Sequence, residues 1–521
     1  MIRFIWKNWW RRKERLVLLL IGVLIISVGL AYLVGLSETN KGTIVNELEE
    51  RWSSSYDIVV RPEGTRGETE EDSLLDPNFL SGIDGGITMD QYETIKDITD
   101  VDIAAPIAMI GSVSYTSYLE SFDLKENGIY RMTKEQVTDN GINEEKDTST
   151  YYFPSGDWKP HVEEKLSEKF KENPEDPESG NYYLKPFEEY VTTNRYFTIA
   201  GIDPEQEAKL IDLDDAIMSE EGSRYFNESD SVSNEEVSPD SDEGPAQYTA
   251  EFPVIINNQT NADQSLNWQI ERLDIPYDMD TADEKLDELE KKGGEEYLDT
   301  LKGTPIKKFH FDEQEIYTRM VNSIAGHDRF TGEKHDKNYL ESDYSTSDHS
   351  FSLRPSPLLY QSMNSPFSDK WDSAYQLQTF ISNELESFRQ PNDYGVVNED
   401  ADYTYIRPEW VGFYNPEKMN LAKDPLNELP METYRPASAE LVLDANEDPI
   451  NPPQELKPTY DPYGYLANPP TMLTTLEAAE MFSGDEPISA IRIKVAGVTE
   501  LSEDSQATIE QVADEIEQKQ V

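Results

Sequence analysis

The stretch Val101–Tyr118 (VDIAAPIAMIGSVSYTSY) is apolar over most of its length and rich in β-branched and aromatic residues. This composition is typical of a long buried strand or of a strand pair. Upstream, Tyr56–Pro62 (YDIVVRP) predicts a short core strand. Between them, Thr88 and Gln91 have the spacing of a capping box, which predicts a helix to about Ile98. Strand, helix and strand together predict a compact α/β unit.

A second strand and helix are predicted in Tyr196–Ile217 (YFTIAGIDPEQEAKLIDLDDAI). The strand ends at Gly201, Asp203 can cap the helix, and Pro204 takes the favoured first helical position. Gln206 completes a capping-box pattern. A further strand is predicted at 252–256.

Near the end of the sequence, Ile488–Val498 (ISAIRIKVAGV) alternates in the manner of a strand. Ser502 can cap a following helix. One face of that helix would carry Ile509, Val512, Ala513 and Ile516. We expect a further element to follow this helix after Val521.

Four other segments carry simpler patterns. Ser219–Gln247 contains nine acids and one base and predicts a disordered loop. Ala282–Leu301 predicts an amphipathic helix loosened by its two adjacent glycines, and Asp372–Phe388 predicts another helix. Pro449–Pro470, with seven prolines, predicts an irregular connector.

The N-terminal region predicts a membrane anchor. Leu16–Leu36 is a run of 21 uncharged residues, long enough as a helix to cross the roughly 30 Å hydrocarbon layer. Six basic residues precede it, which places the N-terminus in the cytoplasm and the chain after about Ser37 outside. Indole rings favour the headgroup zone, so segment 1–15 is expected to be interfacial. The residues expected to anchor and orient the span are Trp6, Trp9, Trp10, Arg11, Arg12, Lys13 and Arg15.

A cleaved signal peptide is the alternative interpretation of this region. Signal peptides have apolar runs of about 7–15 residues and end in a small-x-small cleavage site. The run here is longer and ends in Tyr32, Leu33, Val34, Gly35 and Leu36, which favours an uncleaved anchor. The sequence contains no second run of this length, so we expect a single crossing of the cell membrane in this chain.

Charge and composition exclude several classes of protein. The chain has 104 acidic and 45 basic side chains, a net charge of −59, and the segment before residue 16 contributes +5, which leaves −64 for the rest. So acidic a chain lacks the basic footprint that nucleic-acid binding requires. It contains no cysteine, which excludes disulfide scaffolds, thiolate metal sites and thiol nucleophiles.

Candidate catalytic and metal-binding patterns are few. The five histidines include no pair spaced as in a zinc protease. Asp444, Asn446, Asp448 and Glu455 match ligand positions of a calcium loop, but Pro449 stands where that loop needs glycine, which favours a solvated acidic turn. No Gly-rich phosphate loop occurs, so this chain is not expected to bind ATP. We predict no catalytic, cofactor-binding or metal residues and no enzymatic activity.

A group of aromatic residues could line a ligand groove, although such residues more often form core and loop packing. They are Trp410, Phe413, Tyr414, Tyr460, Tyr463 and Tyr465.

Several stretches resemble the extracytoplasmic region of FtsX-like (MacB-like) ABC transporter permeases. Besides the basic head with its span, Tyr56–Pro62 and Ile488–Val498 with the Ser502 helix, these are Gly464–Ala479 (GYLANPPTMLTTLEAA), Ala200–Leu213 (AGIDPEQEAKLIDL) and Val411–Pro416 (VGFYNP). The resemblance covers both ends of the chain and islands between them.

This resemblance implies a permease subunit with four spans and a large outer domain between the first two. It also implies a separate ABC ATPase subunit, a permease dimer and an extracytoplasmic accessory protein as partners. The chain would then be the N-terminal part of such a permease, without the later spans. The outer domain would combine a membrane-proximal α/β subdomain, 38–118 with 488–521, and an inserted mixed subdomain, 119–487, that contains the acidic loop 219–247.

The expected fold is therefore α+β, with one N-terminal transmembrane helix (16–36) and a large extracytoplasmic region. The expected function is transmission of ATP-driven conformational change to that region, to export or release a substrate or to control an outer partner. Two alternatives stay open. One is a single-span surface protein that binds cell-wall material or a cationic peptide, and the other is an anchored hydrolase with buried carboxylates.

Overall fold

The computed structural model describes residues 55–519, except for 77, 125, 156–189, 238–246, 279–280, 327–350, 367–372, 383–384, 391–402, 422–430, 432, 445, 447 and 499–501. The described chain is a mixed α+β structure with more strand than helix, which confirms the predicted fold class. Among these residues no helix is both long and apolar enough to cross a membrane, and the predicted span 16–36 lies outside them.

The larger sheet contains nine strands among the described residues. Seven form its main path, and two pair with strands of that path. The spatial order is β1 (Ile58–Val60), β19 (Ala490–Val495), β2 (Val101–Ser121), β5 (Tyr190–Ile202), β18 (Met472–Thr475), β7 (Gln247–Asn257) and β15 (Tyr403–Tyr414), with β10 (Phe351–Leu353) on β2 and β6 (Ser233–Val237) on β7.

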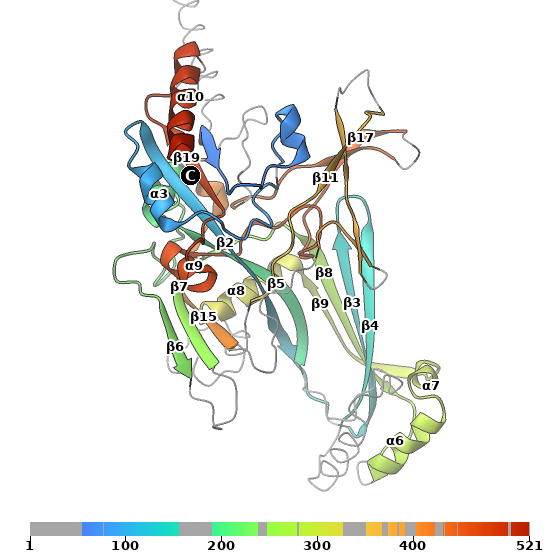
Figure 1. Cartoon of the computed structure of the whole chain (residues 1–521). Coiled ribbons are helices and arrows are strands. Elements are labelled where there is room, and N and C mark those ends of the chain that lie inside the picture. Colours follow the sequence, from blue (N-terminus) through green and yellow to red (C-terminus); the bar gives the residue numbers. More distant parts are fainter. Residues whose placement is uncertain are drawn as a thin grey trace, which may run out of the picture.

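A second, antiparallel sheet lies beside β2 and β5, on the right in Figure 1. Its order is β4 (Glu144–Ser155), β3 (Gly128–Asp139), β8 (Asp263–Leu273) and β9 (Gly303–Asp312). The remaining described strands form three hairpins, which are β11 (Tyr360–Met363) with β12 (Ala374–Leu377), β13 (Phe380–Ser382) with β14 (Leu385–Ser387), and β16 (Glu440–Leu443) with β17 (Pro449–Glu455).

The helices lie around these sheets. Figure 1 shows α10 at one end of the molecule near β19, and α6 and α7 at the far end of the second sheet. The α-helices are α3 (Met89–Lys96), α5 (Pro204–Ile211), α6 (Ala282–Lys291), α7 (Glu295–Asp299), α8 (Glu313–Ile324), α9 (Leu476–Ser483) and α10 (Glu503–Gln518), and the 3₁₀ helices are η1 (Glu68–Asp72) and η4 (Pro416–Lys418).

Strand β2 is the longest described strand and lies between β19 and β5 in the larger sheet. The predicted strand or strand pair at 101–118 is one strand of 21 residues. It pairs with β19 through its first residues and with β5 from Ile107 to Ser121. The β2/β5 register shifts between Met109 and Gly111, which marks a β-bulge. Because a bulge changes which residues share a face, Ile110 and Val113 both point into the same core.

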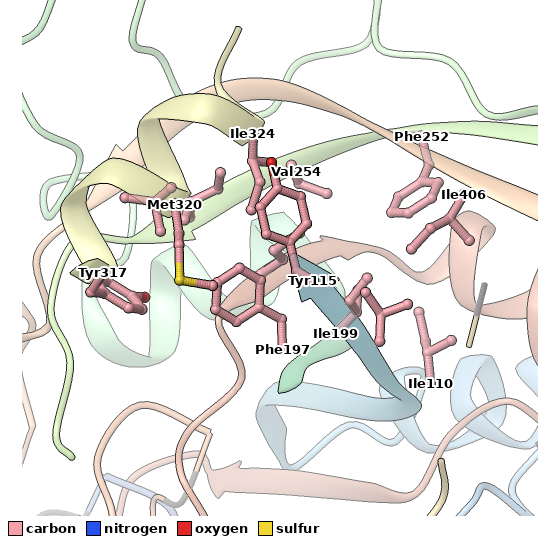
Figure 2. Close-up of a cluster of buried hydrophobic side chains, with 14 of the residues drawn as sticks. Ile110, Tyr115, Phe197, Ile199, Phe252, Val254, Tyr317, Met320, Ile324 and Ile406 are labelled. Carbon is pink, nitrogen blue, oxygen red and sulfur yellow. The ribbon is translucent and has the colours of Figure 1, made fainter. Parts of the chain in front are cut away.

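Side chains of the larger sheet bury two cores. One contains β2 and β5 residues together with side chains of α3, α8, α9, α10 and the second sheet. Figure 2 shows Tyr317, Met320 and Ile324 of α8 packed over Phe197 and its neighbours. The other core contains side chains of α5, of the loop around 79–80 and of the end of β15, together with Met419, Leu421, Met431 and Tyr434. The larger sheet is therefore covered on both faces.

The helix starts follow their predicted caps. Thr88 and Gln91 form the expected capping box at α3. Asp203 accepts hydrogen bonds from the backbone N–H groups of Glu205 and Gln206, as predicted for α5. The predicted capping box with Gln206 is wrong, because Gln206 Oε1 accepts instead from the Ala104 backbone N–H on β2 at 3.1 Å. Ser502 caps α10, and Val512 and Ile516 of that helix are buried.

Two predicted helices are corrected. Within the predicted helix 372–388, residues 374–377, 380–382 and 385–387 form short strands and not a helix, since β12 pairs with β11 and β13 with β14. Its apolar residues do not form a helical core face, and Ile381 is 79% exposed. The helix predicted at 282–301 is two helices, because Gly293 and Gly294 between them both have positive φ.

Two predicted irregular segments contain strands. The acidic segment 219–247 was predicted to be disordered, but its residues 233–237 form β6 on the edge of β7. In the proline-rich connector 449–470, residues 449–455 form β17. Composition alone does not show that a segment pairs with another strand. Proline is tolerated in an edge strand because one side of that strand needs no hydrogen-bond partner.

The two ends of the described chain meet in one place. β19 lies between β1 and β2, so residues of the predicted segments 38–118 and 488–521 share a sheet. That sheet continues through β5, β18, β7 and β15, which lie within 119–487. β2 itself crosses residue 118 without interruption.

Candidate functional site

A cavity of about 80 Å³ lies over the bulge of β2. Its floor is formed by Met109, Gly111 and Ser112 of β2 and by Tyr196 and Thr198 of β5. Its other walls come from the segments 81–84, 354–355 and 459–468 and from Arg389. Bulges occur often beside functional sites because they reorient side chains. The cavity is therefore the best candidate site among the described residues.

Two arginines line this cavity, and both hold loops in place. Arg389 is 1% exposed and donates to the carbonyl oxygens of Gly464 (3.2 Å), Ser81 (3.0 Å) and Ser356 (3.1 Å). Arg354 donates from Nε to the carbonyl of Ile110 at 2.9 Å, at the bulge itself. Carbonyl oxygens stabilise a guanidinium without cancelling its formal charge.

A glycine lets two of these loops approach each other. Gly82 has φ +97°, and a Cβ there would stand 2.3 Å from the Pro357 nitrogen. Any other residue would force the segments 81–84 and 354–357 apart. The mouth of the cavity thus depends on a glycine as well as on Arg389.

Two carboxylates complete the charged lining. Partial desolvation raises the pKa of Asp84, and the positive charge of Arg354 opposes that rise. Asp461 accepts a hydrogen bond from the Tyr463 backbone N–H at 3.0 Å, which fixes the turn that carries it. Two positive and two negative side chains therefore surround one small space.

Tyr460 connects the cavity with the opposite face of the sheet. It lines the cavity with Tyr196 and Thr198, and its ring lies 5.2 Å from the guanidinium carbon of Arg195. Adjacent residues of a strand point to opposite faces, so Arg195 and Tyr196 do not share a side. Tyr460 lines the cavity and also lies near Arg195, so it connects the cavity with the other face of β5.

Beyond Tyr460, Arg195 forms a buried ion pair with Glu313 at the start of α8. The Arg195 Nη2 to Glu313 Oε2 distance is 3.0 Å, and both side chains are less than 5% exposed. Desolvation raises the pKa of Glu313, while the charge of Arg195 and the hydroxyl of Tyr460 act to lower it. A change at the cavity wall would thus reach α8 through two contacts.

A second buried pair lies on the other face. Arg492 of β19 bonds to Glu207 of α5, and the Tyr434 hydroxyl donates to the second Glu207 oxygen at 2.6 Å. Desolvation lowers the pKa of Arg492. This group joins β19 and α5 to the turn that carries Tyr434.

The predicted site residues have different outcomes. Asp444 closes the β16–β17 turn, where its Oδ1 accepts from the backbone N–H groups of Asn446 (2.8 Å) and Asp448 (2.9 Å), which confirms an acidic turn. In the part of the chain that the structure describes, no group of three His, Asp or Glu side chains could hold a metal ion. The predicted membrane-anchoring residues Trp6, Trp9, Trp10, Arg11, Arg12, Lys13 and Arg15, and the histidines 161, 327, 335 and 349, lie outside the described residues.

The predicted aromatic groove is not one groove. Phe413 and Tyr414 are buried in core packing, and the Trp410 ring lies 5.2 Å from Phe413. Tyr460 does line the cavity, whereas the Tyr465 ring packs 6.0 Å from Phe388. Core packing is therefore the main role of this set, with Tyr460 as the exception.

Sequence reasoning missed most of the charged residues of the site. Arg492, which pairs with Glu207 away from the cavity, is one of two cations in the strand Ala490–Val495, and the other is Lys494. Arg354, Arg389 and Asp461 lie in segments without periodic pattern. Comparison with models of protein families, with characterised proteins and with solved structures finds no match to the chain.

Proposed function

We propose that the chain is the permease subunit of an ABC transporter and that its larger sheet transmits ATP-driven movement from the membrane to the extracytoplasmic region. The predicted span at 16–36 and its basic flank support the membrane attachment. The resemblance of the terminal segments to FtsX-like permeases supports the transporter class.

The observation that carries the proposal is the joint between β1 and β19. The two strands are antiparallel neighbours, so the chain leading in from the predicted span lies beside the strand that leads to α10. Asp57 fastens them, since its carboxylate accepts from Lys494 Nζ at 3.0 Å and from the Val495 backbone N–H at 2.8 Å. Movement of either attached segment would therefore pull on both strands.

From this joint the movement has a stiff path outward. β19 pairs with β2, whose 21 residues extend about 70 Å at ~3.3 Å per residue. β2 then pairs with β5 and, at residue 121, approaches the start of the second sheet at β3. Arg492 and Glu207 tie the same end of the sheet to α5. A long strand with one face buried over most of its length is suited to carrying a displacement without local unfolding.

The test uses the full chain, tagged and solubilised from its native membranes. We expect an ABC ATPase to copurify with it, and ATP analogues to change the limited-proteolysis pattern of the exterior. If no ATPase copurifies, and if the chain has a single span and binds a cationic peptide tightly, the result would instead support the surface-protein alternative.

A matched pair of variants tests the joint. Asp57→Asn should keep the ATPase bound but weaken the nucleotide-dependent change of the exterior, because the β1–β19 clamp loses its charge. Asp139→Asn is the control, since Asp139 also pairs with a lysine, Lys457, but away from this joint. Equal responses of the two variants would remove the joint from the mechanism.

A further inference from the structure

We propose that the cavity over the β2 bulge binds a small zwitterion, an amino acid with a short side chain such as glycine, alanine or serine. This inference is independent of the proposed transport role, because it rests on the lining of the cavity alone. It assigns a ligand class to a site and leaves the partners of the chain open.

The charges of the lining favour a molecule with both signs. Arg354 and Arg389 offer positive charge for a carboxylate, and Asp84 and Asp461 offer negative charge for an ammonium group. Charge-assisted hydrogen bonds of these kinds are stronger than neutral ones. A ligand with both charges can contact both pairs, whereas a ligand with one charge can contact only one of them.

The neutral part of the lining suits a short ligand. The hydroxyl groups of Ser112 and Thr198 are hydrogen-bonded to each other at 3.1 Å beside the cavity, and Met109 and Tyr460 supply apolar surface. A cavity of about 80 Å³ holds roughly five to eight water-sized groups at ~10–15 Å³ each. Glycine, alanine and serine have five to seven non-hydrogen atoms, whereas an aromatic amino acid would exceed the space.

The charge of the whole chain acts in the same direction. With a net charge of −59, the protein repels free anions at long range, so a simple carboxylate is disfavoured before it reaches the arginines. Simple cations are attracted to the entire surface but meet two guanidinium groups inside the cavity. A molecule without net charge avoids both penalties.

The first experiment is isothermal titration calorimetry of the full chain in detergent with glycine, alanine and serine. Acetate and methylammonium, which each carry one half of the zwitterion, and tryptophan, which is too large, are the comparison ligands. We expect the half-ligands and tryptophan to bind at least about tenfold more weakly than the best small amino acid, because each loses a charged pair or the fit. Equal affinity for acetate, or no binding of any small amino acid up to about 10 mM, would overturn the proposal.

Variants then locate the binding site. Ala467→Phe should fill the cavity and abolish binding, while Ala496→Phe, at an exposed turn, is the matched control. Asp461→Asn keeps the oxygen that accepts from Tyr463 and should weaken amino-acid binding about tenfold, with the exposed Asp214→Asn as its control. Thermal melting of each variant shows whether it folds. Undiminished binding by folded Ala467→Phe would place the ligand elsewhere and refute the assignment.

Discussion

Two arginine–glutamate pairs are buried on opposite faces of the larger sheet, and they are built alike. Each joins an arginine on a strand to a glutamate in the first turn of a helix, Arg195 to Glu313 of α8 and Arg492 to Glu207 of α5. In each, a tyrosine from a loop adds a hydroxyl and lies near the arginine. The same device therefore fastens one helix to each face.

Their surroundings differ. Arg195 also donates to the Thr193 hydroxyl at 2.8 Å and to the Asn194 carbonyl at 2.9 Å, and its tyrosine borders the cavity. Arg492 is held by Glu207, and its Nε and Nη1 atoms have no hydrogen-bond partner among the described residues. Arg492 thus depends on a single carboxylate for its stability, whereas Arg195 has several partners.

The comparison indicates what each pair can do. A buried ion pair gives little net stability over an apolar replacement, but loss of one partner leaves a costly charge. The Arg492 pair is sealed and should behave as a fixed clamp. The Arg195 pair contacts a cavity wall and contains a carboxyl whose pKa is raised, so it can adjust to its surroundings.

The largest effect is expected at the sealed pair. Arg492→Leu should lower the free energy of unfolding by about 3–5 kcal/mol, because Glu207 stays buried without its cation. Replacing the whole group by Arg492→Leu, Glu207→Leu and Tyr434→Phe should restore most of the loss, since no buried charge remains. Denaturant unfolding of the full chain measures both. A triple variant as unstable as the single one would show that packing, and not charge, dominates there.

A smaller effect is expected at the other pair. Arg195→Met should cost about 1–3 kcal/mol, because Glu313 can take up a proton and the lost hydrogen bonds are the main penalty. The measurement is the same unfolding experiment, compared directly with Arg492→Leu. If Arg195→Met proved the more damaging of the two, the assignment of the clamp role to Arg492 would be wrong.

The next smaller effect is a pH dependence of stability that comes from the Arg195–Glu313 pair. The pKa of Glu313 in the folded protein lies above its ordinary value, because desolvation outweighs Arg195. The folded state then binds a proton more readily than the unfolded state, so this group's contribution to stability falls as pH rises through the interval between the two values, and is constant above it. Glu313→Gln should remove that fall. Unfolding midpoints of both proteins, measured from about pH 4 to 7, give the difference. A parallel pair of curves would contradict it.

The sequence predicted elements that depend on local pattern. The box at Thr88, the cap at Asp203 and the strand at 490–495 follow from side chains within a few residues of one another. Errors occurred where a distant strand decided the outcome. β6 forms because β7 offers an edge, and 374–387 pairs into hairpins although its apolar spacing also fits a helix.

The candidate site was beyond sequence reasoning for the same reason. Arg354, Arg389 and Asp461 are far apart in the chain, and their hydrogen bonds include bonds to backbone groups, carbonyls for the arginines and an N–H group for Asp461, which no residue type specifies. Gly82 is needed at the site, because its positive φ and its close approach to Pro357 leave no room for a side chain. A single sequence does not distinguish this glycine from other loop glycines. Among the aromatic residues proposed for a groove, Tyr460 alone was placed by the fold at the cavity.

The smallest effects on stability are expected from removing the two tyrosine hydroxyls, and they test how each hydroxyl contributes to its arginine–glutamate pair. Tyr460→Phe should cost about 0.5–1.5 kcal/mol, since its hydroxyl bonds to the neutral Thr260 hydroxyl at 2.7 Å. Tyr434→Phe should cost about 1.5–3 kcal/mol, because its hydroxyl donates to the charged Glu207 carboxylate. Tyr460 also helps to hold down the pKa of Glu313, so Tyr460→Phe should extend the fall in stability of the wild-type curve to higher pH. Identical pH profiles for Tyr460→Phe and the wild-type protein would mean that Tyr460 is not electrostatically connected to Glu313, and the path from the cavity to α8 would then rest on the Arg195 ring contact alone.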